Sequence, residues 1–135
     1  MTTWQSGRES EYLDDIIAGR KTIEGRLNRG KFADFKVGDL VSLRRDYRND
    51  QGVLQDGEPG AALVKVVAIR KYESFSELTT AEDYKKVIPK ATSVQQAADE
   101  YNKFYSAEDQ AKYGVLATEV KPEMTKFDNI GCRLK

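Results

Sequence analysis

The sequence predicts an α+β fold: a small mixed β-barrel of about five strands with helices packed over its ends. Its 135 residues, 39% of them hydrophobic, suffice for one core and are too few for two full domains. Apolar residues recur every two positions in some segments and every three to four in others, which indicates both strands and helices. A closed barrel avoids the unpaired edges that an open sheet leaves, although the same pattern is compatible with an open α+β sheet.

An amphipathic helix opens the predicted fold over residues 10–19, with Ser10 as its N-cap and Gly19 at its C-terminal end. Its apolar face is formed by Tyr12, Leu13, Ile16 and Ile17. The repeat then shortens to two residues, which indicates a strand. Ile23 and Leu27 form its buried face, and Glu24 and Arg26 share the opposite one.

Two further strands are predicted before the middle of the chain. A turn over residues 37–39 leads into a strand over residues 40–45, and β-branched residues indicate a central strand over residues 61–72. The stretch between them, residues 46–60, is polar and rich in Gly, Asp and Asn. We expect it to form a long exposed hairpin loop.

Helices separate the third predicted strand from the last one. Three capping boxes mark their starts, at Ser74–Glu77, Thr80–Asp83 and Ser93–Gln96. The helix after Ser93 has an apolar face made of Val94, Ala97, Ala98, Tyr101, Phe104 and Tyr105. A short helix from Ser106 to Gly114 and a strand over residues 115–120 follow. We expect the domain to span residues 1–121, with residues 122–135 as an irregular tail or one packed on the barrel.

The composition excludes several kinds of active site. Histidine is absent, which rules out Ser-His-Asp and Cys-His nucleophiles, His-ligated zinc and two-histidine ribonuclease sites. The single cysteine, Cys132, has no partner in the chain, and the N-terminus lacks an apolar run. We therefore expect a cytoplasmic protein.

Charge is distributed unevenly along a chain whose net charge is zero. Residues 20–48 hold nine Lys or Arg against four Asp or Glu, whereas residues 73–110 hold four against eight. A nucleic-acid site must therefore be a local patch. The acidic segment 73–110 is a candidate surface for a protein partner.

The octapeptide from Gly19 to Arg26 carries the strongest functional signal. It resembles the GxKxxExR signature of ASCH domains at all four defined positions, and the family's order of elements is followed over residues 10–121. The resemblance implies a PUA-like barrel, a cleft beside the motif, and association with RNA or nucleotides. Some ASCH proteins hydrolyse acetylated cytidine with a threonine nucleophile, and this chain has Glu24 at that position. Members that keep the glutamate are linked to RNA binding and, in some cases, to RNA cleavage.

The predicted ligand is RNA or a nucleotide, and no membrane is expected to be a partner. Lysine supplies a point charge and arginine a planar fork for phosphate, and an ionised glutamate accepts hydrogen bonds from a base or a ribose. The predicted binding residues are Lys21, Glu24, Arg26, Asn28, Arg45, Tyr47 and Arg48. Because neighbouring residues of a strand alternate in direction, at most one of Arg44 and Arg45 faces the cleft. We assign Tyr101, Phe104, Tyr105 and Tyr113 to packing.

Three hypotheses remain open at this stage. The first is a binding module without chemistry. The second is a hydrolase of RNA or of a modified nucleoside, with Glu24 and Lys21 as the catalytic residues; we expect no cofactor, apart from a divalent ion if the protein is hydrolytic. The third is a protein-interaction module that uses residues 73–110.

Overall fold

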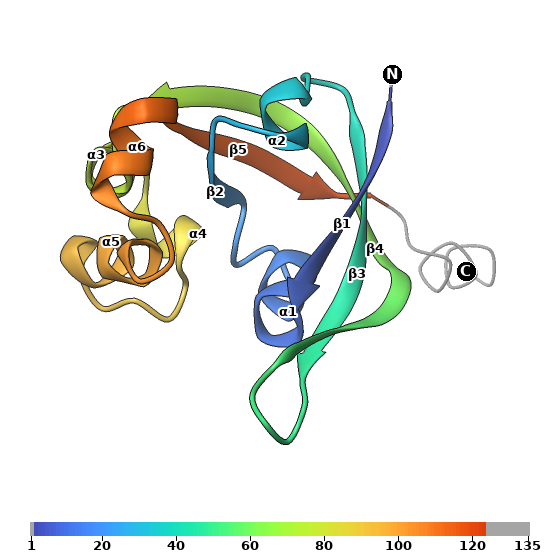
Figure 1. Cartoon of the computed structure of the whole chain (residues 1–135). Helices are drawn as coiled ribbons and strands as arrows, with labels where there is room; N and C mark the ends of the chain where they lie inside the picture. The colour runs from blue at the N-terminus through green and yellow to red at the C-terminus, as the bar shows by residue number, and fades with distance from the viewer. Residues whose placement is uncertain (1, 124–135) are drawn as a thin grey trace.

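One curled sheet of five strands, in the order β1-β3-β4-β5-β2, organises the fold (Figure 1). The computed structural model describes residues 2–123. β1 runs parallel to β3, and all other neighbouring strands are antiparallel, so the sheet is mixed. The strands are β1 (Thr3–Glu9), β2 (Ile23–Leu27), β3 (Leu40–Arg48), β4 (Leu54–Tyr72) and β5 (Val115–Pro122). The sheet curls into a half-barrel, which confirms the predicted fold class.

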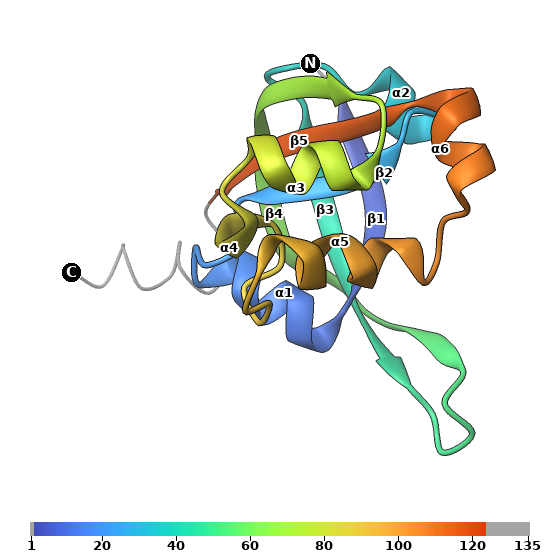
Figure 2. The ribbon, with the colours of Figure 1, turned by 90° about the vertical axis from the view of Figure 1, so that its left-hand side faces the viewer.

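Six helices within residues 2–123 pack around this sheet. They are α1 (Ser10–Ile17), α2 (Lys31–Asp34), α3 (Phe75–Ala81), α4 (Tyr84–Val87), α5 (Val94–Asn102) and α6 (Ala107–Tyr113). α3 to α6 form a layer on the β2 side of the half-barrel, and α1 lies beneath its opening (Figures 1 and 2). None of the helices within this range is long and apolar enough to cross a membrane.

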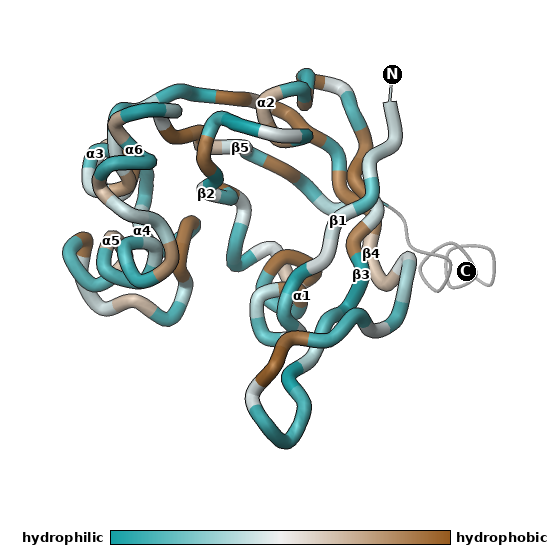
Figure 3. The backbone as a smooth tube through the Cα atoms, in the orientation of Figure 1, coloured by the Kyte–Doolittle hydropathy of each residue, from teal (hydrophilic) through white to brown (hydrophobic). Residues whose placement is uncertain are grey.

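The hydrophobic core has two parts, one on each face of the sheet. Hydrophobic segments run along β4 and β5 between them (Figure 3). One part fills the half-barrel and consists of Leu13, Ile16, Phe35, Val41, Leu43, Ala62, Val64, Val66 and Val120. The other lies under the helical layer and consists of Ile23, Leu27, Phe75, Leu78, Val87, Ile88, Ala91, Ala97, Val115 and Ala117. β2 lies between the two parts, so its residues are covered on both faces.

Serine caps begin three of the helices as the sequence predicts. The side chains of Ser74, Ser93 and Ser106 each accept a hydrogen bond from the backbone N–H three residues later. The predicted box at Thr80 is wrong, because Thr80 lies inside α3 and its hydroxyl donates to the Ser76 carbonyl at 2.8 Å. Asp83 caps α4 instead, by accepting from the Lys85 N–H.

The start of the chain differs most from the prediction. Residues 3–9 form β1, which was not predicted, and Glu9 rather than Ser10 precedes α1 as its N-cap. Ser10 is already helical, and its hydroxyl accepts from Arg45 at 2.6 Å. The prediction missed β1 because its inward side chains include Ser6 and Arg8, so no apolar repeat marks the strand.

In the hairpin between β3 and β4, the strands are longer and the loop is shorter than predicted. Its turn occupies only residues 49–53, where Asn49 Oδ1 accepts from the N–H groups of Gln51 and Val53. Polar residues continue both strands, and Asp46 accepts from the Gly57 N–H at 3.2 Å. The polar composition of this hairpin predicts a loop, whereas these residues form an exposed two-stranded ribbon that projects from the body (Figures 1 and 2).

The predicted tail boundary falls near the end of the described residues. β5 continues to Pro122, two residues past the predicted end of the last strand. Cys132 and the rest of residues 124–135 lie outside the described residues.

Candidate nucleic-acid site

An ion pair joins the two edge strands of the half-barrel. Arg8 on β1 donates through Nη2 to Glu24 Oε1 on β2 at 2.8 Å and through Nε to Oε2. Arg8 Nη1 also donates to the Ser6 hydroxyl at 2.6 Å and to the Gly7 carbonyl at 2.7 Å. Both partners are 6% exposed. Side chains thus connect β1 and β2, which lie at opposite ends of the strand order.

Glu24 is held as a carboxylate. Burial alone would raise its pKa, but the charge of Arg8 and its hydrogen bonds lower the pKa to about 2, with smaller contributions from Arg26 and Lys21. Both carboxylate oxygens are bonded to Arg8. Glu24 therefore serves chiefly as a fixed negative charge that orients Arg8.

Lys21 enters the site from the turn between α1 and β2. Gly19 reverses the chain with a φ of 79°, a conformation that glycine adopts without strain. The Lys21 ammonium donates to the carbonyls of Ile23, at 3.0 Å, and of Val87. Burial lowers the pKa of Lys21 to about 8, with Glu24 opposing the shift and Arg8 adding to it. Lys21 is thus a buried cation that ties α4 to β2.

Arg26 differs from the other two cations in its contacts. Its guanidinium lies over the ring of Phe32 in α2, 4.5 Å from the ring centroid. Among residues 2–123, no carboxylate, carbonyl or hydroxyl accepts a hydrogen bond from it under ordinary geometric limits. Burial lowers its pKa, and the neighbouring charge of Arg8 adds to that effect. Within the described residues, Arg26 therefore contacts an aromatic face and is not part of the Arg8–Glu24 ion pair.

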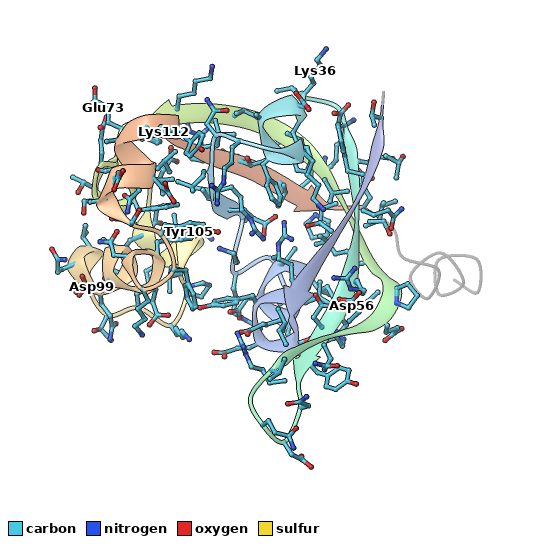
Figure 4. All side chains as sticks on the ribbon, viewed as in Figure 1. Lys36, Asp56, Glu73, Asp99, Tyr105 and Lys112 are labelled. Carbon is cyan, nitrogen blue, oxygen red and sulfur yellow. The ribbon has the colours of Figure 1, made fainter. Side chains whose placement is uncertain are left out.

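These groups line a cavity of about 140 Å³ beside the β2 edge. Its wall consists of Arg8, Tyr12, Lys21, Glu24, Gly25, Arg26, Ile88, Glu100, Tyr101, Phe104 and Tyr105. Figure 4 labels Tyr105, which lies between the helical layer and β2. Gly25 allows the close approach of the helices, because a Cβ atom there would lie 2.8 Å from Tyr101 Cζ. Its N–H donates to the Tyr101 hydroxyl at 3.1 Å.

Comparison with known proteins agrees with this architecture. The family model of the ASCH domain matches residues 8–124. The chain belongs to the ASCH domain family. ASCH domains have a PUA-like fold that is often linked to RNA binding. No protein of curated function matches the sequence significantly.

Solved structures resemble this ASCH domain over most of its length. The crystal structure of hypothetical protein PH0355 is 36% identical, with a TM-score of 0.75, and the match covers 90% of this chain and 99% of that one. Protein PF0455 from Pyrococcus furiosus, solved by NMR, is 35% identical with a TM-score of 0.69, over 89% of this chain and 96% of that one. An ASCH domain from Lactobacillus crispatus has a TM-score of 0.55 at 16% identity, over 88% and 79% of the two chains, and shows the fold alone.

The motif residues of this ASCH domain meet in the cavity, whereas the other predicted binding residues lie elsewhere. Asn28 follows β2, and its N–H donates to the Gly114 carbonyl. Arg45 bonds Ser10 and Asp14 on α1, and Arg48 bonds Glu9. Tyr47 is 53% exposed on the hairpin. None of these four lines the cavity, and a binding role for them stays a prediction.

Sequence reasoning missed several contributors to the cavity, among them an arginine and two tyrosines. Arg8 was overlooked with β1, although Trp4, Ser6 and Arg8 have the two-residue spacing of a strand. The tyrosines assigned to packing do pack, since Tyr101 and Tyr105 stack on Phe75 with centroids 4.4 and 5.1 Å away. Their other atoms line the cavity. One aromatic side chain can thus serve both the core and a site.

Proposed function

We propose that this ASCH domain binds single-stranded RNA and holds one nucleotide in the cavity beside β2. The observation that carries the proposal is Arg26, whose guanidinium lies in the cavity wall over the Phe32 ring. Within the described part of the chain its hydrogen-bond donors have no acceptor. A planar guanidinium in this state suits phosphate oxygens or a base edge.

The charges and rings around Arg26 support the same ligand. Arg8 and Lys21 add two buried cations to the wall, against Glu24 and Glu100, and Glu100 is paired with Lys103 at 2.9 Å. The cavity is therefore positive on balance in a chain whose net charge is zero. Aromatic side chains interleaved with cations are typical of sites for single-stranded nucleic acid.

The test is the salt dependence of binding to a fluorescent decamer of uridylate. Affinity should fall as salt rises, with a log–log slope of about −0.7 for each phosphate neutralised. The Arg26→Gln variant should bind about tenfold more weakly, because a phosphate loses its charged partner, and its slope should be shallower by about one phosphate.

Lys36→Gln is the matched control. It changes the net charge by the same amount, and Lys36 is exposed at a distance from the cavity (Figure 4). We expect wild-type affinity for this variant. A flat salt response of the wild type, or equal losses in the two variants, contradicts the proposal.

A hydrolase of RNA or of a modified nucleoside is the alternative, and Lys21 is the observation that favours it. Its pKa of about 8 is close to neutral pH, where proton transfer is most effective. Glu24, with a pKa of about 2 and both oxygens bonded to Arg8, is a poor base. A hydrolase at this site would therefore transfer protons through Lys21. Intact RNA and N-acylated cytidine after incubation, with and without Mg²⁺ or Mn²⁺, would contradict the alternative.

A further inference from the structure

Phe104 is the part of the cavity that internal packing does not explain. It lies on the connection between α5 and α6 and lines the cavity, yet it is 71% exposed. It is the most exposed large hydrophobic side chain among residues 2–123. Tyr101 and Tyr105 stack on Phe75, whereas within the same residues no ring stacks on Phe104. Its ring is available at the cavity rim.

The size of the cavity limits how much of an RNA chain it holds. An apolar cavity of about 150 Å³ accommodates one benzene ring. The cavity beside β2, at about 140 Å³, therefore has room for a single ring. A strand whose base occupies it must place the next base outside, at the rim where Phe104 is exposed.

Two cations in or next to the cavity are suited to the phosphate that links two such nucleotides. Arg26 forms part of the wall, with its donors available. Lys90 lies 5.2 Å from the centroid of the Tyr12 ring, and Tyr12 also lines the cavity. Lys90 also contacts the exposed Glu11 carboxylate at 3.9 Å, and its own side chain is 46% exposed. Arg26 and Phe104 thus line the same cavity, and Lys90 lies next to it over the Tyr12 ring.

We propose that Phe104 is a stacking platform for the base that follows the one in the cavity. The ligand of this site is then an RNA segment of at least two nucleotides, and not a free mononucleotide. This inference rests on the proposed function. Base–aromatic stacking requires the aromatic ring of Phe104, whereas the identity of the base matters little.

The experiment compares binding of uridine monophosphate, diuridylate and triuridylate at constant salt. In the wild type, the second nucleotide should raise affinity about tenfold, the effect of one stacked base. The third should add much less. In Phe104→Ala, the gain in affinity from one to two nucleotides should fall to about twofold, which is the contribution of the added phosphate alone.

Two further variants make the test specific for stacking. Phe104→Trp should keep the gain, because it keeps a π-face, whereas Phe104→Leu should lose it although it keeps apolar area. Thermal unfolding should be unchanged in all three variants, since the side chain is largely exposed.

The inference is overturned if the gain is the same in wild type and Phe104→Ala, or if Phe104→Leu keeps it. Either result leaves the proposed function standing, provided that binding still depends on Arg26. If no uridylate binds the wild type, including the decamer, the proposed function itself fails.

Discussion

The cavity and the β3–β4 hairpin are both rich in arginine, but they hold their charges differently. In the cavity, Arg26 has no acceptor among residues 2–123, whereas Arg8 donates four hydrogen bonds, two of them within a buried ion pair. On the hairpin, Arg44 pairs with Asp46 and Asp56, and Arg48 pairs with Glu9. Both of these arginine side chains are partly exposed. The number of basic residues is therefore similar in the two regions, but their ion pairing differs.

The hairpin is also less basic than its arginines suggest. Residues 44–58 contain three arginines, and also the four acids Asp46, Asp50, Asp56 and Glu58, which gives a formal charge of −1. A polyanion gains little there from long-range attraction. The cavity wall holds three cations and two carboxylates, which gives a formal charge of +1, and is the stronger anion site.

The largest expected effect concerns the stability of the two regions. Replacing Arg8 by Met leaves Glu24 buried and unpaired, and should lower the free energy of unfolding by about 3–5 kcal/mol. The double variant Arg8→Met, Glu24→Met should recover most of that loss, because well-packed apolar groups can replace a buried pair. Urea denaturation measures both.

The matched change on the hairpin is Arg48→Gln, whose partner Glu9 is partly exposed. It should cost about 1 kcal/mol or less, because exposed ion pairs contribute little. Similar losses for Arg8→Met and Arg48→Gln would show that the two regions do not differ as described.

The second effect is an opposite response of stability and binding to pH. Burial lowers the pKa of Lys21 from 10.5 to about 8, so between these values the unfolded chain binds a proton that the folded one lacks. The free energy of unfolding should therefore gain a contribution that rises with pH over this window. Affinity for uridylate should fall over the same window, as the cavity loses a cation.

Lys21→Met isolates this effect from the titration of other groups. As pH rises past 8, the unfolding free energy of the wild type should increase relative to that of the variant. Over the same range, the higher affinity of the wild type for uridylate should approach that of the variant. Parallel pH profiles of wild type and variant in both measurements would show that Lys21 does not titrate in this range.

The smallest effect is expected on RNA binding by the hairpin. Arg45→Gln and Arg48→Gln should each change the affinity for the uridylate decamer less than twofold, because each of these arginines is already paired with a carboxylate. A loss as large as that of Arg26→Gln would restore these arginines, with Tyr47, to the binding site.

Much of this arrangement was accessible from the sequence, and the exceptions have physical causes. The two-residue repeat of β2 placed Glu24 and Arg26 on one face, and serine caps fixed three helix starts, because both signals are local. Arg8 was missed because only a long-range contact, 16 residues away, explains a buried arginine on β1. Local patterns cannot reveal such partners.

Phe104 illustrates a different limit. Its position matches the apolar face of the helix that begins after Ser93, so the repeat predicts burial. α5 ends at Asn102, however, and the chain then leaves the helical path before Ser106 caps α6. A repeat predicts the orientation of a side chain only as far as the helix continues.

The most direct test of the account is NMR titration of the 15N-labelled protein with diuridylate. We predict that backbone amide shifts concentrate at residues 21–26 and 101–105, around the cavity, and leave residues 44–56 of the hairpin unchanged. Shifts confined to the hairpin, with the amides around Arg26 unaffected, would contradict the claim that the cavity is the RNA site.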